Sequence, residues 1–170
     1  MPEGTPFTKI DRTEALGAAI VLQGDSLAAA RSAADRFARE HGLTLVHPYD
    51  DRAIIAGQGT AALELLADCP GLDTIVVPVG GGGLIAGVAV AARALAPETA
   101  IVGVQSALYP AMYQALRGKP ATAPEDGATI AEGIAVKEPG RLTRRIIAAL
   151  VAEIRLVAEA AIEGAVETLI

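Results

Sequence analysis

The stretch that most constrains the fold covers residues 73–87, with four consecutive glycines at its centre: Gly80, Gly81, Gly82 and Gly83. A β-branched run before the glycines predicts a short buried strand, and an apolar, alanine-containing run after them predicts a helix over about 84–95. Glycine has no Cβ, so the chain can turn sharply here and expose its amides. Those amides and the positive end of the helix dipole together predict an anion site, most naturally for a phosphate group. The alternative is a connector without a ligand. We favour the anion site because one glycine suffices for a turn, and we expect four in a row to pack against nothing.

Strand and helix patterns alternate along the chain. Strands are expected over 18–22, 43–46, 75–79, 100–104, 129–136 and 153–157, helices over 8–16, 26–41, 51–66, 84–95, 109–116, 142–151 and 160–170, and a polar loop over 121–127. Strands separated by helices predict an α/β protein with parallel twisted sheets and helices on both faces. Gly57 and Gly59 fall inside a predicted helix, which indicates either close packing against another backbone or a local break.

Composition excludes several classes of function. The net charge is −6 and no basic cluster is present, which argues against nucleic acid as a partner. Cys69 is the single cysteine and the two histidines lack companions, so neither a disulfide nor a zinc site is expected. A charge-free run over 74–92 contains a proline and several glycines, which favours strand-loop-helix over a membrane span. The N-terminus does not resemble a signal peptide, and we expect a cytoplasmic protein.

Three kinds of phosphate-binding site contain a glycine loop: the Walker-type nucleotide loop, the dinucleotide-binding fold and the site for pyridoxal phosphate. A Walker-type loop is excluded because the glycines lead into Leu84 and Ile85 rather than Gly-Lys-Ser/Thr. Gly81, Gly83 and Ala86 fit the dinucleotide spacing, but Gln105 stands where a ribose-binding acid is expected. A noncatalytic Rossmann-like nucleotide-binding module therefore remains the alternative. Pyridoxal phosphate requires the phosphate cradle without the ribose acid.

The chain resembles the threonine dehydratase and serine racemase family, which are fold-type II pyridoxal-phosphate enzymes. The resemblance covers essentially the whole chain. It rests on His47-Pro48-Tyr49-Asp50-Asp51, Gly57-Gln58-Gly59-Thr60, the tetraglycine with Leu84-Ile85-Ala86-Gly87, Val102-Gly103-Val104-Gln105 and Glu132-Gly133-Ile134. It implies a truncated two-lobed, tryptophan synthase β-like fold. Residues 1–50 would belong to the small lobe, 51–72 to a helical segment between or joining the lobes, and 73–170 to the large, phosphate-binding lobe.

The resemblance also implies the site and the reaction. Amides of the four glycines and of Leu84 would hold the phosphate of pyridoxal 5'-phosphate, and Gly133 would line the cofactor ring. The reaction would be elimination of water from L-threonine or L-serine, giving a 2-oxo acid and ammonia.

The departures from the family pattern are large. The family's Schiff-base lysine and its substrate-gripping loop belong to motifs upstream of the matching region. Lys9, Lys119 and Lys137 each look like solvated charges. We therefore expect no catalytic residue in this chain, which we interpret as a central fragment, inactive alone.

The resemblance also bears on metals and partners. Two carboxylates bind a divalent cation in some members, but Gln105 and Ala111 stand there, so no metal is expected. The substrate would be a small amino acid. Open strand edges predict a homo-oligomer or another association.

Overall fold

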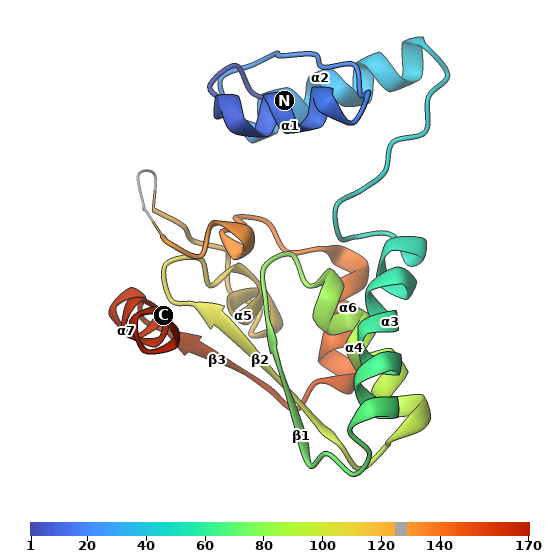
Figure 1. Ribbon diagram of the computed structural model, residues 1–170, viewed down its shortest axis with the longest axis vertical. Helices are drawn as coiled ribbons and strands as arrows, with labels where there is room; N and C mark the ends of the chain where they lie inside the picture. The colour runs from blue at the N-terminus through green and yellow to red at the C-terminus, as the bar shows by residue number, and fades with distance from the viewer. Residues whose placement is uncertain (125–128) are drawn as a thin grey trace. The chain divides into compact units, whose positions relative to one another are not determined.

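The computed structural model describes residues 1–124 and 129–170, which form two compact units, Met1–Val46 and His47–Ile170. Residues 125–127 of the predicted polar loop lie outside the described part. An α/β fold with a parallel sheet is confirmed (Figure 1). The elements are α1 (Phe7–Ala15), α2 (Leu27–Glu40), α3 (Arg52–Asp68), β1 (Thr74–Pro78), α4 (Gly83–Leu95), β2 (Ala100–Ser106), α5 (Ala111–Leu116), the 3₁₀ helix η1 (Glu132–Ile134), α6 (Arg141–Leu150), β3 (Glu153–Val157) and α7 (Glu159–Leu169).

The sheet of the second unit has the strand order β1-β2-β3, with both pairs parallel. Ile75 pairs with Ile101, and Gly103 pairs with Ile154. Side chains alternate between the two faces of a strand, so Ile75 and Val77 are buried, whereas Val76 between them is 63% exposed. One face of β1 therefore carries the core.

Helix α4 is the centre of this core. Its residues Ile85, Ala86 and Ala89 are buried, and the helix packs against α3, α6 and the sheet (Figure 1). The close packing expected for the glycines of α3 occurs at one of them. A methyl group on Gly59 would lie 3.0 Å from the carbonyl oxygen of Gly87 in α4, whereas one on Gly57 would meet nothing within 4 Å. The helix continues through both positions without a break.

The first unit contains two helices. Ser26 caps α2 by accepting a hydrogen bond from the amide of Ala29 at 3.2 Å. The strands predicted over 18–22 and 43–46 are wrong, because both segments lack regular secondary structure and neither joins the described sheet. β-Branched residues favour extended backbone, but a strand also requires a continuous partner. The first segment has only scattered bonds, such as that from the N-terminal amine of Met1 to the carbonyl of Val21 at 2.7 Å.

The strand predicted over 129–136 is also wrong. Residues 132–134 form the 3₁₀ helix η1, in which the amide of Ile134 donates to the carbonyl of Ala131 at 3.0 Å. This local bonding replaces a ladder, and the sheet has no place for the segment beside β2, which β1 and β3 already flank. The other predicted strands and helices of the second unit are confirmed within about two residues at their ends. Among the described helices, none combines the length and the hydropathy that a membrane crossing requires.

Candidate phosphate-binding site

The glycine loop connects the carboxyl end of β1 to the N-terminus of α4. Gly82 is the N-cap residue of α4 and has a φ of +93°, a left-handed conformation that glycine adopts without strain. Gly81, Gly82 and Gly83 are buried, and Gly80 is half-buried. The predicted strand, turn and helix start therefore occur in the predicted order.

Protein atoms pack closely on this loop, which corrects the expectation that consecutive glycines pack against nothing. A methyl group on Gly82 would lie 2.7 Å from the Cε of Met112 and 2.9 Å from the Cδ1 of Ile147. One on Gly81 would overlap the ring of Tyr49, and one on Gly83 would lie 3.0 Å from the Cβ of Tyr49. Packing alone therefore explains why glycine is needed at these positions. Whether the loop binds a ligand depends instead on whether its amides have hydrogen-bond partners in the protein.

The amides of the loop are the groups that indicate a ligand. Within the described part of the chain, the N–H groups of residues 80–84 donate to no backbone or side-chain acceptor, and no side chain caps α4. Backbone N–H groups of buried residues are almost always paired with protein, water or a ligand. An anion at the N-terminus of α4 would meet both these donors and the positive end of the helix dipole. The donor set fits a phosphate group.

The loop's carbonyl side, in contrast, is bound to protein. The carbonyl oxygen of Gly81 accepts from the Oγ1 of Thr143 at 2.8 Å and from the amide of Gly140 at 3.3 Å. Thr143 is fully buried in the first turn of α6. The loop is therefore anchored to α6 through its acceptor, which leaves its donors available.

Asp50 fixes the start of α6 from 91 or more residues away. Its carboxylate accepts hydrogen bonds from the amides of Arg141 at 2.9 Å, Leu142 at 2.8 Å and Thr143 at 3.1 Å. Burial raises the pKa of Asp50, but these three amides and the nearby His47 outweigh it and hold the pKa below its ordinary value. Asp50 is thus the charged cap of α6.

Tyr49 and its neighbours complete the support of the loop. The Tyr49 hydroxyl donates to the carbonyl of Glu138 at 2.9 Å, and the amides of Tyr49 and Asp50 donate to the Nδ1 of His47 at 3.2 and 2.8 Å. The 47–51 motif contributed to the family resemblance, but its individual side chains had no assigned role. Their partners lie about 90 residues further along the chain, so no local sequence pattern could reveal the contact.

Gly133, the candidate for the cofactor ring, lies in η1 beside the loop. A methyl group on Gly80 would lie 3.1 Å from the Cα of Ile134 and 3.0 Å from the Cγ2 of Val136, so the structure brings η1 and the loop together. Gly133 itself is exposed, and a methyl group there would meet nothing within 4 Å. Packing does not explain a glycine at this position.

Gln105 is fully buried, and its Oε1 accepts from the amide of Tyr113 in α5 at 2.9 Å. It therefore supports α5, and its burial argues against contact with a ribose. No group of three or more His, Cys, Asp or Glu residues in the described part of the chain could hold a metal ion. Lys9, Lys119 and Lys137 are all exposed, so none has the apolar setting that activates a Schiff-base lysine.

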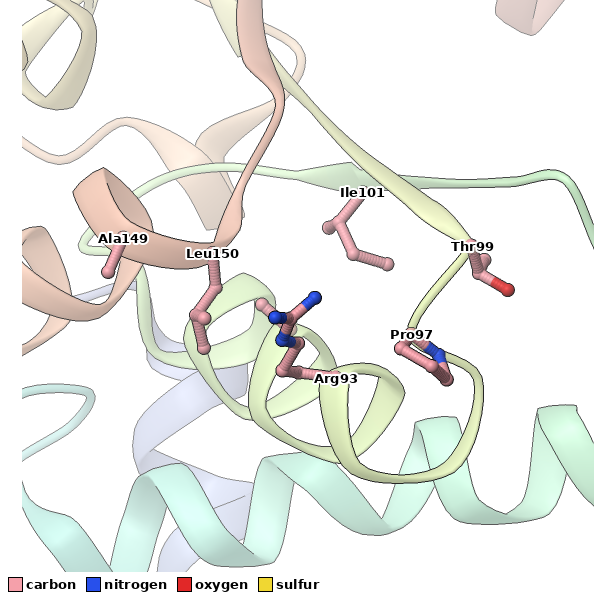
Figure 2. Close-up of a pocket in the computed structure, with 7 residues that line it drawn as sticks. Arg93, Pro97, Thr99, Ile101, Ala149 and Leu150 are labelled. Atoms are coloured by element: carbon pink, nitrogen blue, oxygen red, sulfur yellow. The ribbon is translucent and has the colours of Figure 1, made fainter.

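A pocket of about 210 Å³ occurs at the opposite end of the sheet from the loop (Figure 2). Its lining residues include Arg93 and Leu150, together with Thr99 and Ile101 at the amino end of β2. In a parallel sheet the amino ends of all strands lie at the same end of the sheet. The glycine loop follows the carboxyl end of β1 and therefore lies at the other end. The pocket is therefore not part of the candidate site.

Comparisons with known proteins agree with this geometry. The family model described as pyridoxal-phosphate dependent enzyme matches residues 1–170. A catabolic L-threonine dehydratase of Staphylococcus aureus is 41% identical over 169 residues, which is 99% of this chain and 49% of the relative. The chain thus spans about half the length of this curated relative.

Solved structures give the same result. Threonine deaminase isoform 2 of Solanum lycopersicum, in its processed form, superposes with a TM-score of 0.91 at 35% identity, covering 99% of this chain and 47% of that one. Maize serine racemase superposes with a TM-score of 0.89 at 33% identity, covering 98% of this chain and 50% of that one. The loop amides at the N-terminus of α4 have no acceptor in the part of the chain that the structure describes, and the fold is shared with these proteins. Together with the family match over the whole chain, this shows that the chain belongs to the family of pyridoxal-phosphate dependent enzymes.

Proposed function

We propose that this chain forms the phosphate-holding part of a pyridoxal-phosphate dependent L-threonine or L-serine dehydratase. Gly80, Gly81, Gly82, Gly83 and Leu84 would hold the cofactor phosphate through their amides. The observation that carries the proposal is the set of loop amides that donate to no acceptor in the described chain. When bound, the cofactor supplies the electron sink for elimination of water from the amino acid.

Three residues outside the glycine loop would hold the loop in its orientation. Tyr49 supports the glycine loop from one side, and Thr143 and Gly140 bind its carbonyl from α6. The segment containing Gly133 would line the cofactor ring. We assign no catalytic residue to this chain, because its three lysines are exposed. We also assign residues 1–50 to part of the small lobe, 51–72 to a helical segment between or joining the lobes, and 73–170 to part of the large, phosphate-binding lobe.

A calorimetric titration of the 170-residue chain tests the proposal, with inorganic phosphate, pyridoxal phosphate and NAD as separate probes. We expect phosphate and pyridoxal phosphate to compete for one site and NAD to bind no more tightly than phosphate. Gly133→Ala is the matched variant, because a methyl group has space there. It should leave phosphate affinity unchanged and weaken pyridoxal phosphate. If neither inorganic phosphate nor pyridoxal phosphate binds, the proposal is overturned. If NAD binds more tightly than pyridoxal phosphate, the nucleotide-binding alternative is established.

Catalysis is tested separately. The chain is incubated with pyridoxal phosphate and L-threonine or L-serine, and 2-oxo acid is measured. Borohydride reduction and peptide mapping then locate any labelled lysine. We expect no 2-oxo acid from this chain alone and no specific label. Specific labelling of Lys9, Lys119 or Lys137, with product formation, overturns the assignment of no catalytic residue.

We further propose a cytoplasmic location and self-association. β1 and β3 are the edges of the described sheet, and the exposed Val76 lies on its uncovered face. Unpaired strand edges and apolar faces favour association with another chain. Light scattering at several protein concentrations measures this, and a concentration-independent monomer mass contradicts it.

A further inference from the structure

The peptide that joins Gly81 to Gly82 has a direction set by α6. A trans peptide is planar, so its carbonyl and its N–H point to opposite sides. The Gly81 carbonyl points to the Thr143 hydroxyl at 2.8 Å and to the Gly140 amide at 3.3 Å. The Gly82 N–H must therefore point away from α6, and it donates to no acceptor in the described chain.

Thr143 is itself held in one place. It is fully buried, and its amide donates to the Oδ1 of Asp50 at 3.1 Å. A methyl group on Gly140 would overlap both the Thr143 hydroxyl and the Asp50 carboxylate, which shows how closely these groups approach. The hydroxyl therefore has a fixed position from which it can orient the loop.

We propose that Thr143 is a positioning residue for the phosphate: its hydroxyl orients the Gly81–Gly82 peptide so that the Gly82 amide faces the anion. This inference rests on the proposed function and deepens it. A peptide between two glycines has many accessible conformations, because glycine adopts positive and negative φ with similar ease. The Gly140 amide alone, at 3.3 Å, holds the carbonyl at a longer distance than the hydroxyl does. Loss of the hydroxyl therefore frees the peptide to rotate.

Two substitutions at this position separate the hydroxyl from the volume of the side chain. Thr143→Val keeps the shape and removes the hydroxyl, and Thr143→Ser keeps the hydroxyl and removes a methyl group. Phosphate affinity is measured on the 170-residue chain by ³¹P NMR titration with inorganic phosphate. We expect Thr143→Val to weaken phosphate binding about tenfold and Thr143→Ser to stay within about threefold of the unchanged chain.

A second readout follows the amide directly. In ¹H–¹⁵N spectra, phosphate should shift the Gly82 amide in the unchanged chain and in Thr143→Ser, and much less in Thr143→Val. Ile154→Val is the control for stability, because Ile154 is a buried core residue of β3 that packs against Gly103, and no loop glycine has it among its nearest neighbours. It should bind phosphate normally.

The outcomes distinguish the two proposals. If the unchanged chain binds phosphate and Thr143→Val binds it equally well, the role of Thr143 is overturned and the proposed function stands. Equal weakening by Val and Ser also overturns it, because the hydroxyl is then irrelevant. If the unchanged chain binds neither phosphate nor pyridoxal phosphate, both proposals fail.

Discussion

Glycine serves two different purposes in this molecule, at the crossing of α3 and α4 and at the loop before α4. At the crossing, Gly59 and Gly87 bring two helix backbones together, and their amides lie inside helices, where the backbone bonds itself. At the loop, Gly81 and Gly82 are packed just as tightly, but their amides have no acceptor in the described chain. Tight packing therefore does not distinguish a binding loop from a structural contact; donors without partners do.

The largest effect is expected at the helix crossing. A methyl group on Gly87 would overlap the carbonyl oxygen of Ile55 and lie 2.5 Å from the amide nitrogen of Gly59. Because both are backbone atoms of α3, the helices must move apart. Gly87→Ala should lower the free energy of unfolding by about 3–5 kcal/mol, measured by urea denaturation. The fraction that remains folded should still bind phosphate, and a loss below about 1 kcal/mol would show that the crossing is not a tight contact.

The next effect is expected in the loop and should differ in kind. Gly82→Ala places alanine at a φ of +93° and brings its methyl group to 2.7 Å from the Met112 Cε. We expect a loss of about 2–3 kcal/mol in the free energy of unfolding, together with loss of phosphate binding. Calorimetry with phosphate on protein that is folded by circular dichroism measures the second effect. Normal binding by this variant would show that phosphate affinity does not depend on the left-handed conformation of Gly82.

Asp50 stabilises the start of α6 through its charge. Asp50→Asn should lower the free energy of unfolding by about 1 kcal/mol at neutral pH, because a charged cap of three amides becomes neutral. The pKa of Asp50 is lower in the folded protein, so its contribution is complete above the unfolded value near 3.9 and is lost as the pH falls through the folded value. Urea denaturation at several pH values should show the two proteins converging below about pH 4. A constant difference down to pH 2 would contradict this.

The smallest effect is an expected gain. Gly57 is exposed inside α3, and a methyl group there meets nothing within 4 Å. Gly57→Ala should raise the free energy of unfolding by about 0.5–1 kcal/mol, because alanine loses less backbone freedom in a helix. Gly59→Ala, only two residues away, should instead destabilise the protein. If both variants gain stability in thermal denaturation, the difference between the two glycines does not exist.

Much of the second unit could be predicted because its signals are local. The β-branched run before Gly80 predicted β1. Asp51 marks the start of α3, and its carboxylate accepts hydrogen bonds from two of the first amides of that helix at 2.8 and 3.2 Å. The strands predicted over 18–22, 43–46 and 129–136 did not form, because a strand requires a partner that lies elsewhere in the chain. Residue pattern alone predicts extended backbone, and the fold decides whether that backbone joins a sheet.

The sequence by itself determined the order of strand, glycine loop and helix, and it indicated the family, since both depend on residues adjacent in the chain. Only the tertiary structure decided which groups hold the loop. The hydrogen bonds that Tyr49, Asp50 and Thr143 make in this support join residues that lie 62 to 93 positions apart in the chain. It also showed that the Gly81 carbonyl is bound to α6, whereas the loop amides have no acceptor among the residues that the structure describes. The direction of a peptide group depends on partners brought together by folding, and no local pattern encodes it.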